Sequence, residues 1–172
     1  MKTTKKTGRS GALLGVALLA LGGCAAFSPP ERPAWDGPDL VGDVDPGRLV
    51  GVWRVTPLNP YPDQGSQDTV IEYRADGTVV GRIDPGDDES MAAFGDAEFD
   101  LSGRWSVVDG SVVHEDMTME STSDNPLGKM VSGMINGSRR DFGGRADIRE
   151  LDADRMVMLG TDGAAMRYDR VR

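Results

Sequence analysis

The chain has 172 residues, of which 38% are hydrophobic and 27% charged, a mixture typical of one globular domain. Its formal charge of −9 argues against a nucleic-acid partner, because phosphate groups repel its 28 acidic side chains. One cysteine and one histidine exclude an internal disulfide and a zinc site built from several Cys and His residues, and we expect neither a metal nor another cofactor.

Residues 1–23 have the pattern of a secretion signal. The first ten residues carry four basic side chains and no acidic one, and they precede the apolar run Gly11–Leu21. Eleven residues are too few to span a bilayer, which takes about 20, but they suit the apolar region of a signal peptide. The signal itself has no acidic residue, so the part that follows it carries 15 basic against 28 acidic residues.

The apolar run ends in Leu21-Gly22-Gly23-Cys24, which resembles the lipobox of bacterial lipoproteins. The resemblance implies cleavage before Cys24 and acylation of its thiol and new amino group. Several acyl chains, at about 0.8 kcal/mol per buried CH₂, would anchor the protein firmly to a membrane. Ala25 stands where the retention signal of inner-membrane lipoproteins has Asp. We therefore expect a lipid-anchored protein of the cell envelope, on the outer membrane and facing the periplasm. The alternative is an ordinary signal peptide with an incidental Cys24.

Residues 24–44 are predicted to form a flexible tether outside the folded domain. Its four prolines remove amide donors and favour extended polyproline II backbone, which would hold the domain off the membrane. The folded domain is predicted to span residues 45–172. Trp35 is the one large aromatic side chain of the tether besides Phe27. Three interactions would suit it: packing on the domain, insertion at the membrane interface or contact with a partner.

The domain reads as an all-β antiparallel meander. Asp-Gly pairs at 76–77, 109–110 and 162–163 lie between β-rich runs, which is a strong hairpin signal. Regularly spaced short strands favour a sandwich or a closed barrel, and closure would remove exposed edges. We predict a barrel of about eight strands, at 49–56, 69–74, 78–83, 101–108, 111–119, 146–151, 155–160 and 164–171.

The first hairpin also predicts which side chains face inward. A three-residue loop ending in Gly77 would place Ile71, Tyr73 and Val79 on one face and Glu72 and Arg74 on the other.

One short helix is expected outside the sheet. Asp124-Asn125-Pro126 supplies capping residues and a proline near the first helical position, and Gly137 can end the helix. Apolar residues recur at helical spacing between them: Leu127, Met130, Val131, Met134 and Ile135.

Gly51-Val52-Trp53 after a short turn, with Gly103-Arg104-Trp105 downstream, resembles the Gly-x-Trp elements of lipocalins and lipocalin-like small bacterial barrels. The resemblance implies that a late basic residue packs over the first tryptophan. Arg167 and Arg170 are the two candidates for this cation–π contact with Trp53.

If the barrel is hollow, it would hold one small apolar or amphipathic ligand. We expect such a ligand to be lined by inward-facing residues of the strands and by methionines of the helix closing the mouth: Ile71, Tyr73, Val79, Trp105, Val113, Met166, Met130 and Met134. The alternative is that the tryptophans and methionines form a plain packed core.

No catalytic residue is expected. His114 precedes Glu115 and Asp116 and would suit a general base, but no activated nucleophile is identifiable near it, and a surface or rim histidine is the simpler interpretation. The primary hypothesis is therefore a non-enzymatic, lipid-anchored envelope protein that binds a small ligand. The alternatives are a filled barrel that binds or inhibits another envelope protein and, more remotely, a hydrolase or isomerase.

We predict that Cys24→Ser releases the protein from the membrane, because the variant lacks the acylated thiol. The barrel domain of the variant should fold normally, since Cys24 precedes it. Detergent-free fractionation measures the release, and persistence of the variant in the membrane fraction would contradict the anchor.

Overall fold

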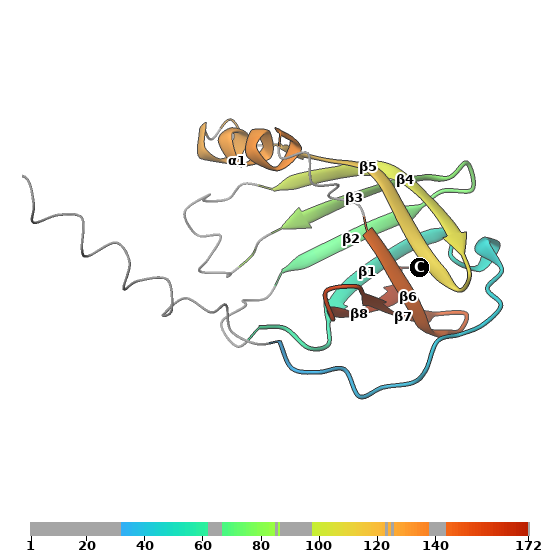
Figure 1. The fold of residues 1–172 in the computed structure, drawn as a ribbon. Helices are drawn as coiled ribbons and strands as arrows, with labels where there is room; N and C mark the ends of the chain where they lie inside the picture. Colours follow the sequence, from blue (N-terminus) through green and yellow to red (C-terminus); the bar gives the residue numbers. More distant parts are fainter. Residues whose placement is uncertain are drawn as a thin grey trace, which may run out of the picture. The chain divides into compact units, whose positions relative to one another are not determined.

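The computed structural model describes residues 32–61, 67–84, 86, 98–122, 124, 126–137 and 144–171. Within them, eight antiparallel strands form a closed barrel in which each strand pairs with its neighbours in sequence and β8 pairs with β1 (Figure 1). The strands are β1 (Gly51–Pro57), β2 (Asp68–Tyr73), β3 (Thr78–Asp84), β4 (Phe99–Val108), β5 (Ser111–Ser121), β6 (Gly144–Leu151), β7 (Arg155–Gly160) and β8 (Ala165–Arg170). The prediction of an all-β meander barrel is confirmed.

The two ends of the barrel differ in their connections. At one end, the turns 74–77, 109–110 and 152–154 are short, and the 3₁₀ helix η1 (Pro46–Arg48) leads into β1. At the other end lie the longer connections 58–67, 85–98 and 122–143, together with the turn 161–164. We call these the short-turn end and the long-connection end. Long connections on a rigid scaffold are where binding residues concentrate.

The predicted hairpin signals are found at the turns. Arg74 N donates to Thr78 O (2.9 Å) and Gly77 N to Arg74 O (3.1 Å), which closes the expected three-residue loop. Asp109-Gly110 forms a two-residue turn between the paired residues Val108 and Ser111. The loop lengths matter because they set which strand residues face the interior.

The predicted helix is present as α1 (Pro126–Gly137), and it packs against β5. Strand β6 pairs with β5 only from Ser111 to His114, so the rest of β5 has no second strand partner among the described residues. Asn136 of α1 fills part of this gap: Met119 N donates to Asn136 Oδ1 (3.0 Å), and Asn136 Nδ2 donates to Met119 O (2.7 Å). The side-chain amide therefore replaces a neighbouring strand and covers an exposed edge.

Residues 32–44, which the sequence assigned to the tether, form a strap along the barrel. Asn59 Nδ2 donates to Pro33 O (2.7 Å), and Val41 N donates to Ile148 O (2.8 Å). Val44 is 7% exposed and belongs to the core. The predicted boundary at residue 45 thus falls inside the segment that contacts the barrel. Within the described parts of the chain, no helix has both the length and the apolar character needed to cross a bilayer.

Candidate functional site

Arg170 seals the short-turn end of the barrel. Its guanidinium carbon lies 4.0 Å from the centroid of the Trp53 ring. Three carbonyl oxygens accept hydrogen bonds from the same side chain: Arg48 O (2.7 Å), Ala153 O (2.8 Å) and Val50 O (2.9 Å). The cation–π contact expected from the lipocalin resemblance is therefore present, and Arg170 makes it.

Arg167, the other candidate, does not contact Trp53. It lies one residue before the inward-facing Tyr168, and strand alternation places its side chain on the outer face. There Arg167 Nε donates to Asp169 Oδ2 (2.8 Å). The register decides between the two arginines, because Arg170 is the residue paired with Trp53.

Gly51 is required by the position of Arg170. Its φ of +143° is a conformation that residues with a Cβ rarely adopt, and a Cβ there would overlap Nη1 of Arg170. Gly103 serves a similar purpose where β4 faces a bulge in β5: a Cβ would lie 2.9 Å from Glu115 O and overlap Met117 Sδ. Both glycines of the Gly-x-Trp elements thus permit a close approach.

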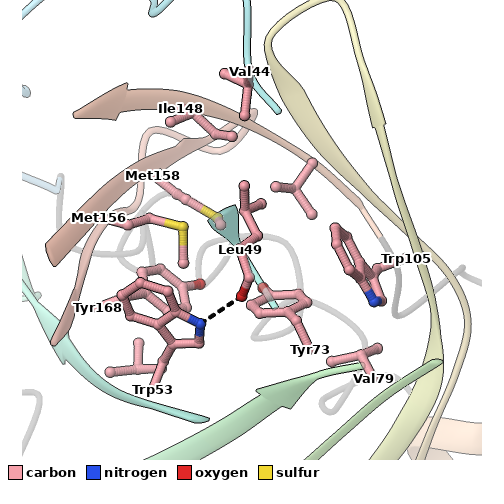
Figure 2. Close-up of a cluster of buried hydrophobic side chains, with 12 residues drawn as sticks. Val44, Leu49, Trp53, Tyr73, Val79, Trp105, Ile148, Met156, Met158 and Tyr168 are labelled. Carbon is pink, nitrogen blue, oxygen red and sulfur yellow. Dashed lines mark hydrogen bonds between the residues drawn. The ribbon is translucent and has the colours of Figure 1, made fainter. Parts of the chain in front are cut away.

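Both tryptophans of these elements face the interior. Trp53 is fully buried and its Nε1 donates to Leu49 O (2.7 Å), while Trp105 Nε1 donates to Arg74 O (3.0 Å). Figure 2 shows Trp53, Tyr73, Trp105 and Tyr168 arranged around Leu49. Tyr73 meets Trp105 edge to face, with ring centroids 5.1 Å apart. The short-turn half of the barrel is therefore a dense aromatic layer.

Tyr73, His114 and Tyr168 form a polar chain inside this aromatic layer. The Tyr73 hydroxyl lies 2.9 Å from His114 Nε2, and Tyr168 lies close enough to raise the pKa of Tyr73. His114 makes a further hydrogen bond to the backbone of Gly144. His114 is half-buried and paired in register with Trp105, so it is not a free surface histidine.

Burial sets the protonation of all three groups. It lowers the pKa of His114 from its ordinary value of 6.5, and the hydrogen bond to Gly144 only partly opposes this. Burial raises the pKa of Tyr73 well above 10, with a further contribution from Tyr168, and raises the pKa of Tyr168 to about 12. All three side chains are thus neutral near pH 7.

The structure brings several of the predicted lining residues together and separates others. Tyr73 and Val79 are buried in the core cluster, and Ile71 and Met166 are half-buried against it. Val113 lies between Val112 and His114, which both face inward, so it belongs to the outer face. On α1, Met130 is 54% exposed, and the side chain of Met134 lies outside the described residues.

The interior is filled at one level and accessible at the next. Leu49, Trp53, Tyr73 and Met156 have no exposed surface, so no void large enough for water touches them. Toward the long-connection end, Phe99, Leu101 and Met119 form a second buried cluster, and four inward-facing apolar residues packed against the two clusters are only half-buried. We call them the accessible layer: Ile71, Ile83, Met117 and Met166.

A separate groove lies on the outside of the barrel across β1–β4, with a volume of about 480 Å³. Val52, Val70 and Val80 supply its apolar part, and charged side chains such as Glu72 and Arg82 flank them. Sequence reasoning missed this groove, although the outward-facing valines of the first three strands were a usable signal.

Among the described residues, no group of three or more His, Cys, Asp or Glu side chains is placed to hold a metal ion. No family model and no curated protein matches the chain. Two solved structures are similar to it in part. Endo-1,5-α-L-arabinanase from Thermotoga petrophila shares 10% identity at a TM-score of 0.40, over 78% of this chain and 23% of the arabinanase chain. A protein from Burkholderia xenovorans shares 12% identity at a TM-score of 0.41, over 81% of this chain and 98% of that chain. Likenesses this distant carry no argument about function.

We predict that Trp53→Ala lowers the free energy of unfolding by about 3–5 kcal/mol, because it removes a fully buried ring and the surface on which Arg170 stacks. Chemical denaturation measures the change. An unchanged denaturation midpoint would show that the ring is not buried. Arg54→Ala, on the exposed face of β1, is the control and should change stability little.

We also predict a pH dependence that belongs to His114. Its folded-state pKa is depressed, so below pH 6.5 the unfolded chain takes up a proton that the native state resists. Native stability should fall as pH drops below 6.5, by at most about 1.4 kcal/mol per pH unit.

The measurement compares denaturation midpoints at about pH 7.5 and 5.5 for the native protein and for His114→Gln, which cannot titrate in this range. The native protein should lose more stability than the variant. Equal losses in the two proteins would contradict the burial of the ring.

Proposed function

We propose that this chain is a lipid-anchored protein of the bacterial cell envelope whose lipocalin-like barrel binds a small apolar or amphipathic ligand. The observation that carries the proposal is the accessible layer above a sealed base. Ile71, Met117 and Met166 face the interior and retain exposed surface, whereas Trp53 and Arg170 close the end below them. A small barrel sealed at one end is suited to holding one such molecule.

The side chains around this layer favour an apolar ligand. Met117 and Met166 are flexible and polarisable, so they adapt to ligands of different shape. The Gly-x-Trp element with Arg170 stacked on Trp53 supports the likeness to lipocalins.

His114 and Tyr73 support a non-enzymatic role. Both ring nitrogens of His114 are engaged, one with Tyr73 and the other with the backbone of Gly144. The Tyr73 hydroxyl is a poor nucleophile because its pKa is raised well above the ordinary value. We infer that the pair is structural and that it links β2 to β5 across the interior.

The outer groove favours a second function, the binding of another envelope protein on the outside of a filled barrel. Its valines are flanked by the ion pairs Glu72–Arg74 (2.9 Å) and Arg82–Asp100 (3.1 Å). An apolar strip with a charged rim is the usual anatomy of a protein interface.

One pair of variants separates the two functions. Ile71→Trp would fill the accessible layer, and Val52→Trp would fill the outer groove. Residues 32–172, which form one compact unit, are titrated with a fluorescent long-chain fatty acid. We predict that Ile71→Trp weakens binding on the order of tenfold or more, about 1.4 kcal/mol, and that Val52→Trp leaves it unchanged.

The opposite pattern would place the ligand in the outer groove, and the absence of binding to any of the three proteins would favour a protein partner. Native mass spectrometry after exposure to an extract of the host envelope would then identify the ligand class. A reproducible added mass of a small molecule supports the proposal, and a bare protein mass speaks against it.

A further inference from the structure

The strap is fixed to the barrel at its first described residues. Asn59 is 6% exposed and all of its side-chain hydrogen-bonding atoms are used. Its Nδ2 donates to Pro33 O (2.7 Å) and to Gly163 O (2.9 Å), and its Oδ1 accepts from Ala165 N (2.8 Å). One buried amide thus ties the strap to the turn between β7 and β8.

Arg32 strengthens this attachment. Its guanidinium carbon stacks 4.1 Å from the centroid of the Tyr61 ring, and its Nη1 donates to Asn59 O (3.2 Å). Asp162 Oδ2 lies 4.0 Å from Nη2, and the Arg32 side chain is only 13% exposed. We call this group the Asn59 clamp: Arg32, Pro33, Asn59, Tyr61 and Asp162.

The clamp lies at the long-connection end. Asn59 lies two residues after Pro57, the last residue of β1, and Asp162 and Gly163 belong to the turn 161–164. From there the strap runs to the short-turn end, where Val41 binds Ile148 O and Val44 enters the core (Figure 1, the blue segment). The first described residues of the chain therefore contact the barrel at the end where the accessible layer lies.

The length of chain before the clamp limits where this end can be. Seven residues lie between Cys24 and Arg32, so the two are eight residue steps apart. At about 3.5 Å per residue, a fully extended chain of this length reaches roughly 28 Å. Without the clamp, the unattached stretch of chain would extend from Cys24 to η1 and would be more than twice as long. The barrel would then be free to turn over.

We propose that the long-connection end of the barrel faces the lipid bilayer, so that the accessible layer opens toward the membrane surface. This inference rests on the proposed anchoring at Cys24. The partner is the bilayer itself, reached through the tether and not through charge, because the acidic chain is repelled by anionic lipid. A barrel held this way would exchange apolar or amphipathic molecules with the membrane across a short gap.

Two labelling sites test the orientation. Met130→Cys lies on the exposed face of α1 at the long-connection end, and Ala75→Cys lies in an exposed turn at the short-turn end. Acylation blocks Cys24, so each engineered cysteine is the one free thiol. The full lipidated protein is placed in phosphatidylcholine vesicles that carry an energy acceptor on their headgroups, and a donor dye is attached to each cysteine.

We expect the transfer efficiency from position 130 to be at least about twofold that from position 75, because the two sites differ in height by much of a strand's length, ~20–30 Å. Equal or reversed efficiencies would overturn the proposed orientation. Flotation of the vesicles is measured in parallel: protein that does not float with them has no anchor, which overturns the proposed anchoring separately.

Variants of the clamp supply the second test. Asn59→Ala should reduce the difference in transfer efficiency between positions 130 and 75. Arg32→Ala should reduce it too, without removing any hydrogen bond within the barrel. Arg54→Ala, an exposed arginine of β1 outside the clamp, should preserve it. If both clamp variants kept the same difference in transfer efficiency as the native protein, the clamp would not orient the barrel.

Discussion

The structure depends on one contact, the stacking of Arg170 on Trp53 at 4.0 Å. A closed barrel requires its last strand to pair with its first, and these two residues stand opposite each other in that pairing. The three carbonyls bound by Arg170 belong to the chain before β1 and to the turn before β7. One cation therefore joins both ends of the domain and seals the base beneath Leu49. Gly51 permits this because a side chain there would occupy the place of the guanidinium.

Much of this fold could be predicted from the sequence because its signals are local. Asp-Gly turns and alternating strands fix eight elements in order, and a barrel follows from their spacing. The side chains whose orientation depends on strand register were harder to predict. The two-residue turn at 109–110 pairs Val107 with Val112, which brings Val112 and His114 inside and leaves Val113 outside. Applying this two-residue turn length to the sequence would have placed His114 inside the barrel. The strap was missed because its attachment depends on Asn59, a polar residue buried only by the tertiary structure.

The interior is divided between stability and binding. Bulky aromatic side chains fill the short-turn half, and their two hydroxyls and the His114 ring satisfy one another, so burial costs little. The other half holds the buried cluster of Phe99, Leu101 and Met119, together with Met117 and Met166, which retain exposed surface. The strap attaches at this same half through Asn59. Sealed base, accessible layer and Asn59 clamp therefore follow one another from the short-turn end to the long-connection end.

The most direct test uses four methionines of this interior as probes. Methyl NMR of residues 32–172 is recorded with and without a small soluble nitroxide, which broadens the signals of accessible methyl groups. Met156 and Met158 are 0% and 1% exposed, whereas Met117 and Met166 are half-buried. We predict broadening of the Met117 and Met166 methyls and sharp signals from Met156 and Met158. Sharp signals from all four would show a filled barrel and contradict the carrier, and broadening of all four would show that Arg170 and Trp53 do not seal its base.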